Sequence, residues 1–222
     1  MGKFFCITAL LVAGLTGSVA AQEANPYQED IETIRHFDEM YAPPQHPVLF
    51  TGSSSIRKWE DLERTFSSYV AMNRGFGGST INDVIHFADQ IIFNYHPRQI
   101  IMYAGENDLL EEGVTADTVF NRFKNLYGLI RKKLPQVPFD YISIKPSPVR
   151  EKYIATAKRA NQLIRAFLAK EPNTAYIDVF PQMVDRNGRP RQELFVEDML
   201  HMNKKGYAIW EKAVKPYLVK QQ

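Results

Sequence analysis

Cysteine is almost absent from this chain of 222 residues, since Cys6 is the only one. Cys6 lies in an apolar N-terminal stretch that we expect to be removed during export. A mature protein without a thiol forms no disulfide and cannot use a thiolate as its nucleophile. The sequence therefore excludes a thiol hydrolase, and it is compatible with an oxidising compartment.

An excess of one charge is also lacking. The 27 Lys and Arg residues nearly balance the 25 Asp and Glu residues, which leaves a net charge of +2. Nucleic-acid-binding proteins present a strongly basic surface to the phosphate backbone. We therefore expect no nucleic-acid partner.

Metal and nucleotide motifs are missing too. The histidines at 36, 46, 86 and 96 show no paired zinc spacing such as His-Glu-x-x-His. The glycine-rich stretch NRGFGGST matches neither the phosphate loop nor the dinucleotide fingerprint Gly-x-Gly-x-x-Gly. The expectation is an enzyme without a metal or cofactor. A flavodoxin-like cofactor binder remains as an alternative, which absorbance of the purified protein tests.

Long apolar runs are confined to the N-terminus. A lysine, an apolar run over 4–15 and small residues follow one another there, at Lys3, Ser18, Ala20 and Ala21. This order is typical of a secretory signal peptide. A membrane anchor is the alternative, but the run is shorter than the roughly 20 residues that span a bilayer. We predict a signal peptide over 1–21, one domain over 22–222, export to the periplasm or the medium, and no stable membrane insertion.

The mature chain alternates short β-rich runs with helical periodicity. The sequence predicts five strands, at 48–51, 69–72, 99–104, 139–144 and 175–180. Apolar spacing close to 3.6 residues predicts helices within 25–44, 56–66, 81–92, 119–134, 153–168 and 203–218. This alternation favours an α/β fold: a three-layer α/β/α sandwich around a mainly parallel five-stranded sheet.

Two polar stretches follow the first two strands. In VLFTGSSSIRKW, Ser53, Ser54 and Ser55 stand where a strand leads into a helix, so each is a candidate nucleophile or a helix cap. In NRGFGGST, successive glycines let a backbone N–H face a ligand, although a tight turn explains them as well. Ligands of parallel sheets bind beyond the carboxyl ends of the strands, where both stretches lie.

Two further stretches carry polar candidates. YAGENDL ends the third strand with Asn107, whose amide could donate to an oxyanion or simply fold into a turn. FVEDMLHMNKK places Asp198 three residues before His201, so that one loop could supply a base and the carboxylate that orients it. A surface carboxylate and a lone histidine are the alternative reading.

Taken together and in this order, the four stretches resemble the four blocks of the SGNH hydrolase superfamily, the GDSL esterases and lipases. The block-defining positions are Ser54, Gly78, Asn107 and His201, and Asp198 fits the Asp-x-x-His acid. Gly52-Ser53-Ser54 stands where the family has Gly-Asp-Ser. The choice of Ser54 over Ser53 and Ser55 depends on this alignment.

The resemblance implies a flavodoxin-like fold and two-step acyl transfer. Ser54 would attack the ester carbonyl, His201 would act as general base, and Asp198 would orient His201. The N–H groups of Ser54 and Gly78 and the amide of Asn107 would form the oxyanion hole.

Short acyl groups, in particular acetyl groups on carbohydrates, are the expected substrates, by analogy with carbohydrate esterases. A lysophospholipase or short-chain lipase is the second hypothesis, and an inactive glycan-binding module is the third. The expected partner is a small-molecule or glycan ester, and the sequence does not indicate an oligomeric state.

Overall fold

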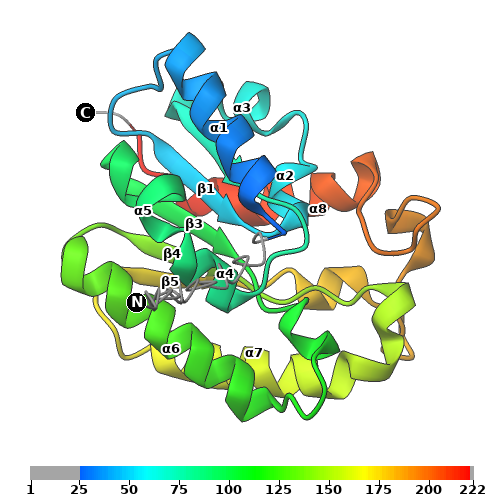
Figure 1. Cartoon of the computed structure of the whole chain (residues 1–222). Helices are drawn as coiled ribbons and strands as arrows, with labels where there is room; N and C mark the ends of the chain where they lie inside the picture. Colours follow the sequence, from blue (N-terminus) through cyan, green and yellow to red (C-terminus); the bar gives the residue numbers. More distant parts are fainter. Residues whose placement is uncertain (1–25, 221–222) are drawn as a thin grey trace, which may run out of the picture.

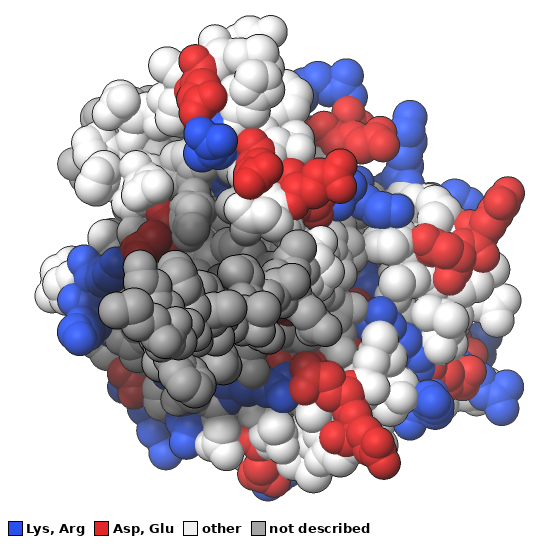
Figure 2. Space-filling view, viewed as in Figure 1, with Lys and Arg blue, Asp and Glu red and all other residues white. Residues whose placement is uncertain are grey.

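The computed structural model describes residues 26–220 (Figure 1). The predicted signal peptide lies outside the described residues. Within them, no helix is long and apolar enough to cross a membrane. The space-filling view shows acidic and basic side chains interspersed over the described part of this face (Figure 2), as the near balance of charges leads one to expect.

A single five-stranded sheet with the order β2-β1-β3-β4-β5 organises the chain, and all neighbouring strands are parallel. The strands are β1 Val48–Gly52, β2 Ala71–Gly75, β3 Gln99–Tyr103, β4 Phe139–Ile142 and β5 Thr174–Ile177. In this order the connection reverses direction between β1 and β3, and ligands of open α/β sheets bind at such a reversal. A ligand site is therefore expected at the carboxyl ends of β1 and β3.

Helices cover both faces of the sheet, as Figure 1 shows. The α-helices are α1 Gln28–Met40, α2 Ser54–Arg57, α3 Leu62–Thr65, α4 Ile81–His86, α5 Ala88–Ile91, α6 Ala116–Lys133, α7 Ile154–Leu168 and α8 Lys204–Val214. Short 3-10 helices are η1 Ser67–Tyr69, η2 Phe93–Tyr95, η3 Asp108–Leu110, η4 Pro148–Tyr153, η5 Phe180–Met183, η6 Gln192–Leu194 and η7 Lys215–Tyr217.

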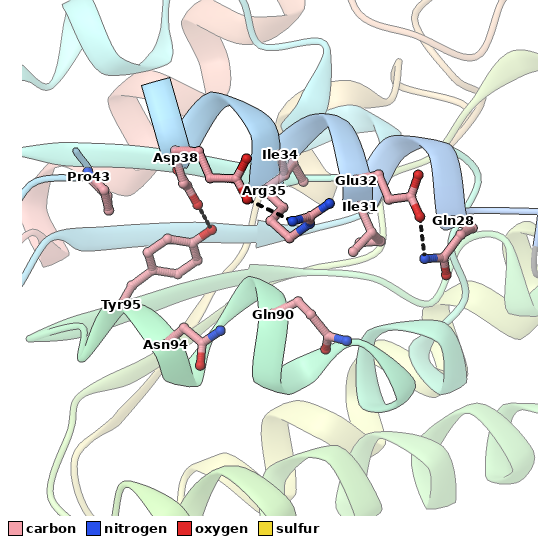
Figure 3. A pocket seen from close by; sticks show the side chains of 11 residues that line it. Gln28, Ile31, Glu32, Ile34, Arg35, Asp38, Pro43, Gln90, Asn94 and Tyr95 are labelled. Carbon is pink, nitrogen blue, oxygen red and sulfur yellow. Dashed lines mark hydrogen bonds and ion pairs between the residues drawn. The ribbon is translucent and has the colours of Figure 1, made fainter. Parts of the chain in front are cut away.

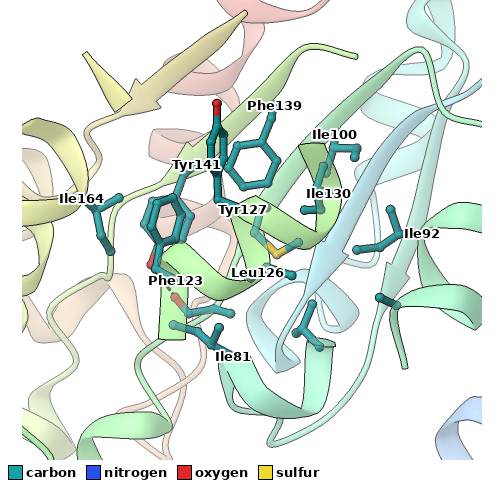
Figure 4. Close-up of a cluster of buried hydrophobic side chains, with 14 of the residues drawn as sticks. Ile81, Ile92, Ile100, Phe123, Leu126, Tyr127, Ile130, Phe139, Tyr141 and Ile164 are labelled. Carbon is teal, nitrogen blue, oxygen red and sulfur yellow. Dashed lines mark hydrogen bonds between the residues drawn. The ribbon is translucent and has the colours of Figure 1, made fainter. Parts of the chain in front are cut away.

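An apolar core lies on each face of the sheet, between the strands and the helices that cover that face. Both cores receive side chains from the same strands, because successive residues of a strand point to opposite faces. Along β3, Ile100 and Met102 pack with α4, α5, α6 and α7, whereas Ile101 and Tyr103 pack with α2, α3 and α8. Figure 4 shows part of the first core, where Phe123 of α6 lies against Tyr141 of β4. The predicted three-layer α/β/α sandwich is confirmed.

Some predicted boundaries were wrong. The second strand begins at Ala71 rather than at 69, because Tyr69 ends a 3-10 turn and Val70 adopts a left-handed conformation with φ +48°. The predicted helix over 56–66 is two short helices, α2 and α3, with a turn between them. The helix predicted over 81–92 is likewise divided, into α4 and α5, and the fifth strand ends at Ile177 rather than 180.

Candidate active site

The turn after β1 sets the position of Ser54. Gly52 has a φ of +121°, and a Cβ there would lie 1.9 Å from the carbonyl oxygen of Tyr103. Only glycine allows this close approach of β1 to β3. The N–H of Ser53 then donates to the same carbonyl at 2.9 Å, and Ser54 begins α2. Ser54 therefore lies at the carboxyl end of β1, where the strand order reverses between β1 and β3.

Of the three candidate serines, only Ser54 is in contact with His201. Ser53 and Ser55 are buried, at 3% and 2% exposure, whereas Ser54 is partly exposed. Ser54 Oγ lies 3.0 Å from His201 Nε2, within hydrogen-bond distance. The structure thus brings together two residues that are 147 positions apart in the sequence.

Asp198 and His201 lie on one loop between η6 and α8. His201 Nδ1 is 2.6 Å from Asp198 Oδ2, and Asp198 Oδ1 accepts the backbone N–H groups of Leu200 and His201. Burial raises the pKa of Asp198, but these hydrogen bonds outweigh it and hold the pKa well below its usual value. Asp198 is therefore a carboxylate at neutral pH, with one oxygen directed at the imidazole.

Backbone hydrogen bonds fix the shape of this loop. Phe195 and Met202 form an antiparallel bridge, and the N–H of Val196 donates to His201 O at 2.9 Å. Met199 takes a left-handed φ of +53° at the tip, a conformation that non-glycine residues rarely adopt. The N–H of Val149 in η4 donates to Met199 O at 3.2 Å and ties the tip to the rest of the domain.

Gly78 lies in the loop between β2 and α4. Its φ is +72°, and Tyr27 Oη donates to its carbonyl oxygen at 3.1 Å. Asp30 of α1 accepts the N–H of the preceding Gly77 at 2.8 Å. The N-terminal end of α1 therefore holds this glycine loop, a role that the sequence did not reveal.

Asn107 follows β3, next to the buried Asp108. Asn107 Nδ2 donates one hydrogen bond to Ser79 O at 2.9 Å, which leaves its second amide N–H without a partner among residues 26–220. Asp108 accepts the N–H of Ile81 at 3.0 Å and pairs with Arg122 at 2.9 Å. These contacts join the loop after β3 to the start of α4.

A buried polar cluster behind Asn107 was missed by the sequence analysis. Glu106 accepts hydrogen bonds from Lys145 Nζ at 2.6 Å and Tyr103 Oη at 2.8 Å, and from Ser147 Oγ. Burial lowers the pKa of Lys145, while the charges of Lys145 and Arg150 outweigh burial and lower the pKa of Glu106. We interpret the pair as ionised. No local motif marks it, because Glu106 and Lys145 are 39 positions apart.

A hollow of about 460 Å³ lies away from these residues, between α1 and η2 (Figure 3). It contains none of the predicted site residues, and Ile31, Asp38 and Tyr95 are among those that line it. Asp38 accepts hydrogen bonds from Tyr95 and Arg74 and so joins α1 to the core.

Comparison with known proteins identifies the family. The family model for GDSL-like Lipase/Acylhydrolase matches residues 43–209, most of the chain. A curated relative, platelet-activating factor acetylhydrolase IB subunit alpha1 of Pongo abelii, is 28% identical over 171 residues, which cover 72% of this chain and 70% of that protein.

Solved structures share the fold. A GDSL-like lipase from Bacteroides thetaiotaomicron superposes with a TM-score of 0.71 at 19% identity, covering 85% of this chain and 97% of that one. A family 3 carbohydrate esterase from Clostridium thermocellum gives 0.60 at 18% identity, with 79% and 98% covered. The chain belongs to the GDSL-like lipase/acylhydrolase family of the SGNH hydrolase superfamily and is a carboxylic ester hydrolase.

Proposed function

We propose that this hydrolase is a serine esterase that works through an acyl-enzyme, with Ser54 as nucleophile, His201 as general base and Asp198 as the carboxylate that orients His201. The observation that carries the proposal is the 3.0 Å distance between Ser54 Oγ and His201 Nε2. The other nitrogen of the same imidazole, Nδ1, lies 2.6 Å from Asp198 Oδ2. An imidazole held in this way can accept the serine proton as the hydroxyl attacks.

The reaction then takes two steps. Ser54 Oγ bonds to the ester carbonyl carbon, its proton passes to His201, and collapse of the tetrahedral intermediate expels the alcohol, which takes that proton. Water then attacks the acyl-enzyme and gives a proton to His201. Collapse of the second tetrahedral intermediate releases the carboxylic acid, and His201 returns that proton to Ser54 Oγ. Because Asp198 stays ionised, it stabilises the imidazolium that forms in each step.

Negative charge on the carbonyl oxygen requires hydrogen-bond donors. We assign this role to the backbone N–H groups of Ser54 and Gly78 and to the side-chain amide of Asn107. The hydrogen bond from Asn107 to Ser79 O, and that from Tyr27 to Gly78 O, support the assignment because they fix these groups before substrate binds. Preorganised donors of this kind are each worth about 3 to 4 kcal/mol of transition-state stabilisation.

Acetyl esters of carbohydrates are the substrates that we favour. Support comes from the fold shared with a family 3 carbohydrate esterase and from relatives named acetylhydrolases. Export to the periplasm or the medium, which the N-terminal sequence predicts, suits enzymes that act on glycans.

A lysophospholipase or short-chain lipase is the second candidate, and a specific observation favours it. Leu110, Val149 and Val196 are exposed at 51%, 58% and 42%. Leu110 lies in η3 after Asn107, Val149 contacts the tip of the His201 loop, and Val196 is in that loop. Exposed apolar side chains on segments that adjoin the proposed site would favour an acyl or alkyl chain.

Hydrolysis of p-nitrophenyl esters from acetate to palmitate, by the wild type and Ser54→Ala, tests the proposal. We expect activity on acetate that the substitution lowers by about 10⁴-fold or more. Ser53→Ala and Ser55→Ala are the matched controls and should retain activity. A preference for long chains would favour the lipase, and full activity of Ser54→Ala would overturn the mechanism.

A further inference from the structure

Arg150 lies beside the proposed oxyanion hole. It belongs to η4, and its Nη1 donates to the carbonyl oxygen of Glu106 at 2.9 Å, one residue before Asn107. The backbone N–H of the preceding residue, Val149, donates a hydrogen bond to the carbonyl oxygen of Met199, in the loop that carries His201. Arg150 thus lies between the segment that supplies Asn107 and the segment that supplies His201.

The charge of Arg150 is not neutralised by a salt bridge within the described part of the chain. The carboxylate of Glu106 is occupied by Lys145, Tyr103 and Ser147, and only its backbone carbonyl accepts from Arg150. The charges of Glu106 and Lys145 cancel each other. This group of residues therefore carries one surplus positive charge next to Asn107.

A hollow of about 650 Å³ lies beside η4, and Arg150 itself is not among the residues that line it. Pro148 and Glu151, on either side of Arg150 in η4, line it, together with the segment that runs from Val184 to Glu193. Three acidic and three arginine side chains lie along its wall: Glu151, Asp185, Glu193, Arg186, Arg189 and Arg191. These six charges balance one another, and the carboxylate of Asp198, the other charge near η4, is hydrogen-bonded to His201 in its own loop.

We propose that Arg150 binds a single anionic group, a carboxylate or a phosphate, on the alcohol part of the ester. The inference rests on the proposed function, because it takes Ser54 as the nucleophile and His201 as the acid that protonates the departing alcohol. In this mechanism the alcohol departs on the side of His201, and the loop of His201 is hydrogen-bonded to η4 through Met199 O and the N–H of Val149. A guanidinium is suited to carboxylate and phosphate, because its paired N–H groups match two oxygens.

Two aryl acetates that differ in one charge test this directly: 3-acetoxybenzoate and its methyl ester. The quantity measured is the ratio of kcat/KM for the anionic ester to kcat/KM for the neutral ester, so that general damage to the site cancels. We expect Arg150→Met to lower this ratio about tenfold, as loss of one charge-assisted hydrogen bond predicts, and Arg150→Lys to restore part of it. Arg35→Met, which removes an exposed arginine of α1, should leave the ratio unchanged.

Further probes locate and identify the anion. 3-Acetoxyphenyl phosphate distinguishes phosphate from carboxylate, and a larger effect of Arg150→Met on either anion supports the proposal. A second pair, mono-4-nitrophenyl succinate and 4-nitrophenyl butanoate, carries the charge on the acyl part, and the same ratio of kcat/KM is measured for it. An effect of Arg150→Met confined to the succinate would overturn the assignment to the alcohol part.

The two proposals fail differently. Hydrolysis of the neutral ester that depends on Ser54, with a ratio that Arg150→Met leaves unchanged, would overturn the role of Arg150 alone. A wild-type protein that hydrolyses none of these esters would overturn the proposed function and this inference with it.

Discussion

The two ends of the sheet use polar side chains in opposite ways. At the amino end, Gln99 Nε2 donates to Asp140 at 2.6 Å and to Tyr217 O at 2.8 Å, and its Oε1 accepts the N–H of Val219. Arg98 donates to the carbonyl oxygens of His46 and Tyr69. These hydrogen bonds close the end of the sheet, and only Arg98 Nε among these groups is buried without a partner in the described residues.

At the carboxyl end, hydrogen-bonding capacity is left over. Asn107 uses one amide N–H on Ser79, and Ser54 is held by one contact with His201. At the amino end of the sheet, the polar side chains bond mainly to other groups of the protein. At the carboxyl end, Ser54 and Asn107 keep hydrogen-bonding groups that a substrate can use. The comparison predicts that substitutions at the carboxyl end change catalysis, whereas those at the amino end change stability.

Among the substitutions that compare the two ends of the sheet, Asn107→Ala has the largest expected effect. Loss of one oxyanion donor should lower kcat by about 10² to 10³-fold. Thermal unfolding should change little, because the residue is partly exposed and makes one hydrogen bond to the backbone. Asn82→Ala, an exposed asparagine of α4, is the control for kcat and for the melting temperature. Equal damage to kcat by both variants would contradict the role of the Asn107 amide as an oxyanion donor.

Arg98→Met should have a smaller effect, and on stability alone. The substitution removes the donors to His46 O and Tyr69 O, so the free energy of unfolding should fall by about 1 to 2 kcal/mol. Urea unfolding measures this change, and kcat of the folded protein should stay within about twofold of wild type because only the amino end is altered. Arg64→Met, at a side chain 80% exposed, should be nearly neutral.

Asp140 gives the smallest effect, which depends on pH. Burial raises its pKa to about 6, so the folded chain retains a proton that the unfolded chain releases. This contribution to stability is complete below about pH 4, the unfolded pKa, and is lost as the pH rises through 6. The free energy of unfolding should be measured for Asp140→Asn and for the wild type at pH 5 and at pH 8. The value for the variant minus the value for the wild type should be about 1 kcal/mol larger at pH 8 than at pH 5. A difference that is constant across this range would contradict the raised pKa.

The pattern of apolar residues predicted much of the fold. The errors in the predicted helix boundaries have a common cause. Ile56, Trp59, Leu62 and Phe66 are all buried, as helical spacing predicts, although the backbone is helical only in parts. Periodicity reports which side chains face the core and not whether the helix is continuous. The second strand was misplaced because tertiary contacts put Val70 in a left-handed turn, which its β propensity does not reveal.

The candidate site divides in the same way. Asp198 and His201 are three residues apart, so their pairing was visible in the sequence, and the resemblance to a family pointed to Ser54. Lys145 and Arg150, by contrast, meet Glu106 only after β3 and β4 have paired. A single sequence has no local pattern for such contacts, and the structure was needed to find them.

The loop that carries Asp198 and His201 has one more consequence. The acid and the base bond to each other and to the backbone of their own loop, so their mutual geometry does not depend on the rest of the domain. Displacement of this loop would separate the pair from Ser54 without dismantling it. Loss of activity by this route would leave the hydrogen bond between Asp198 and His201 intact.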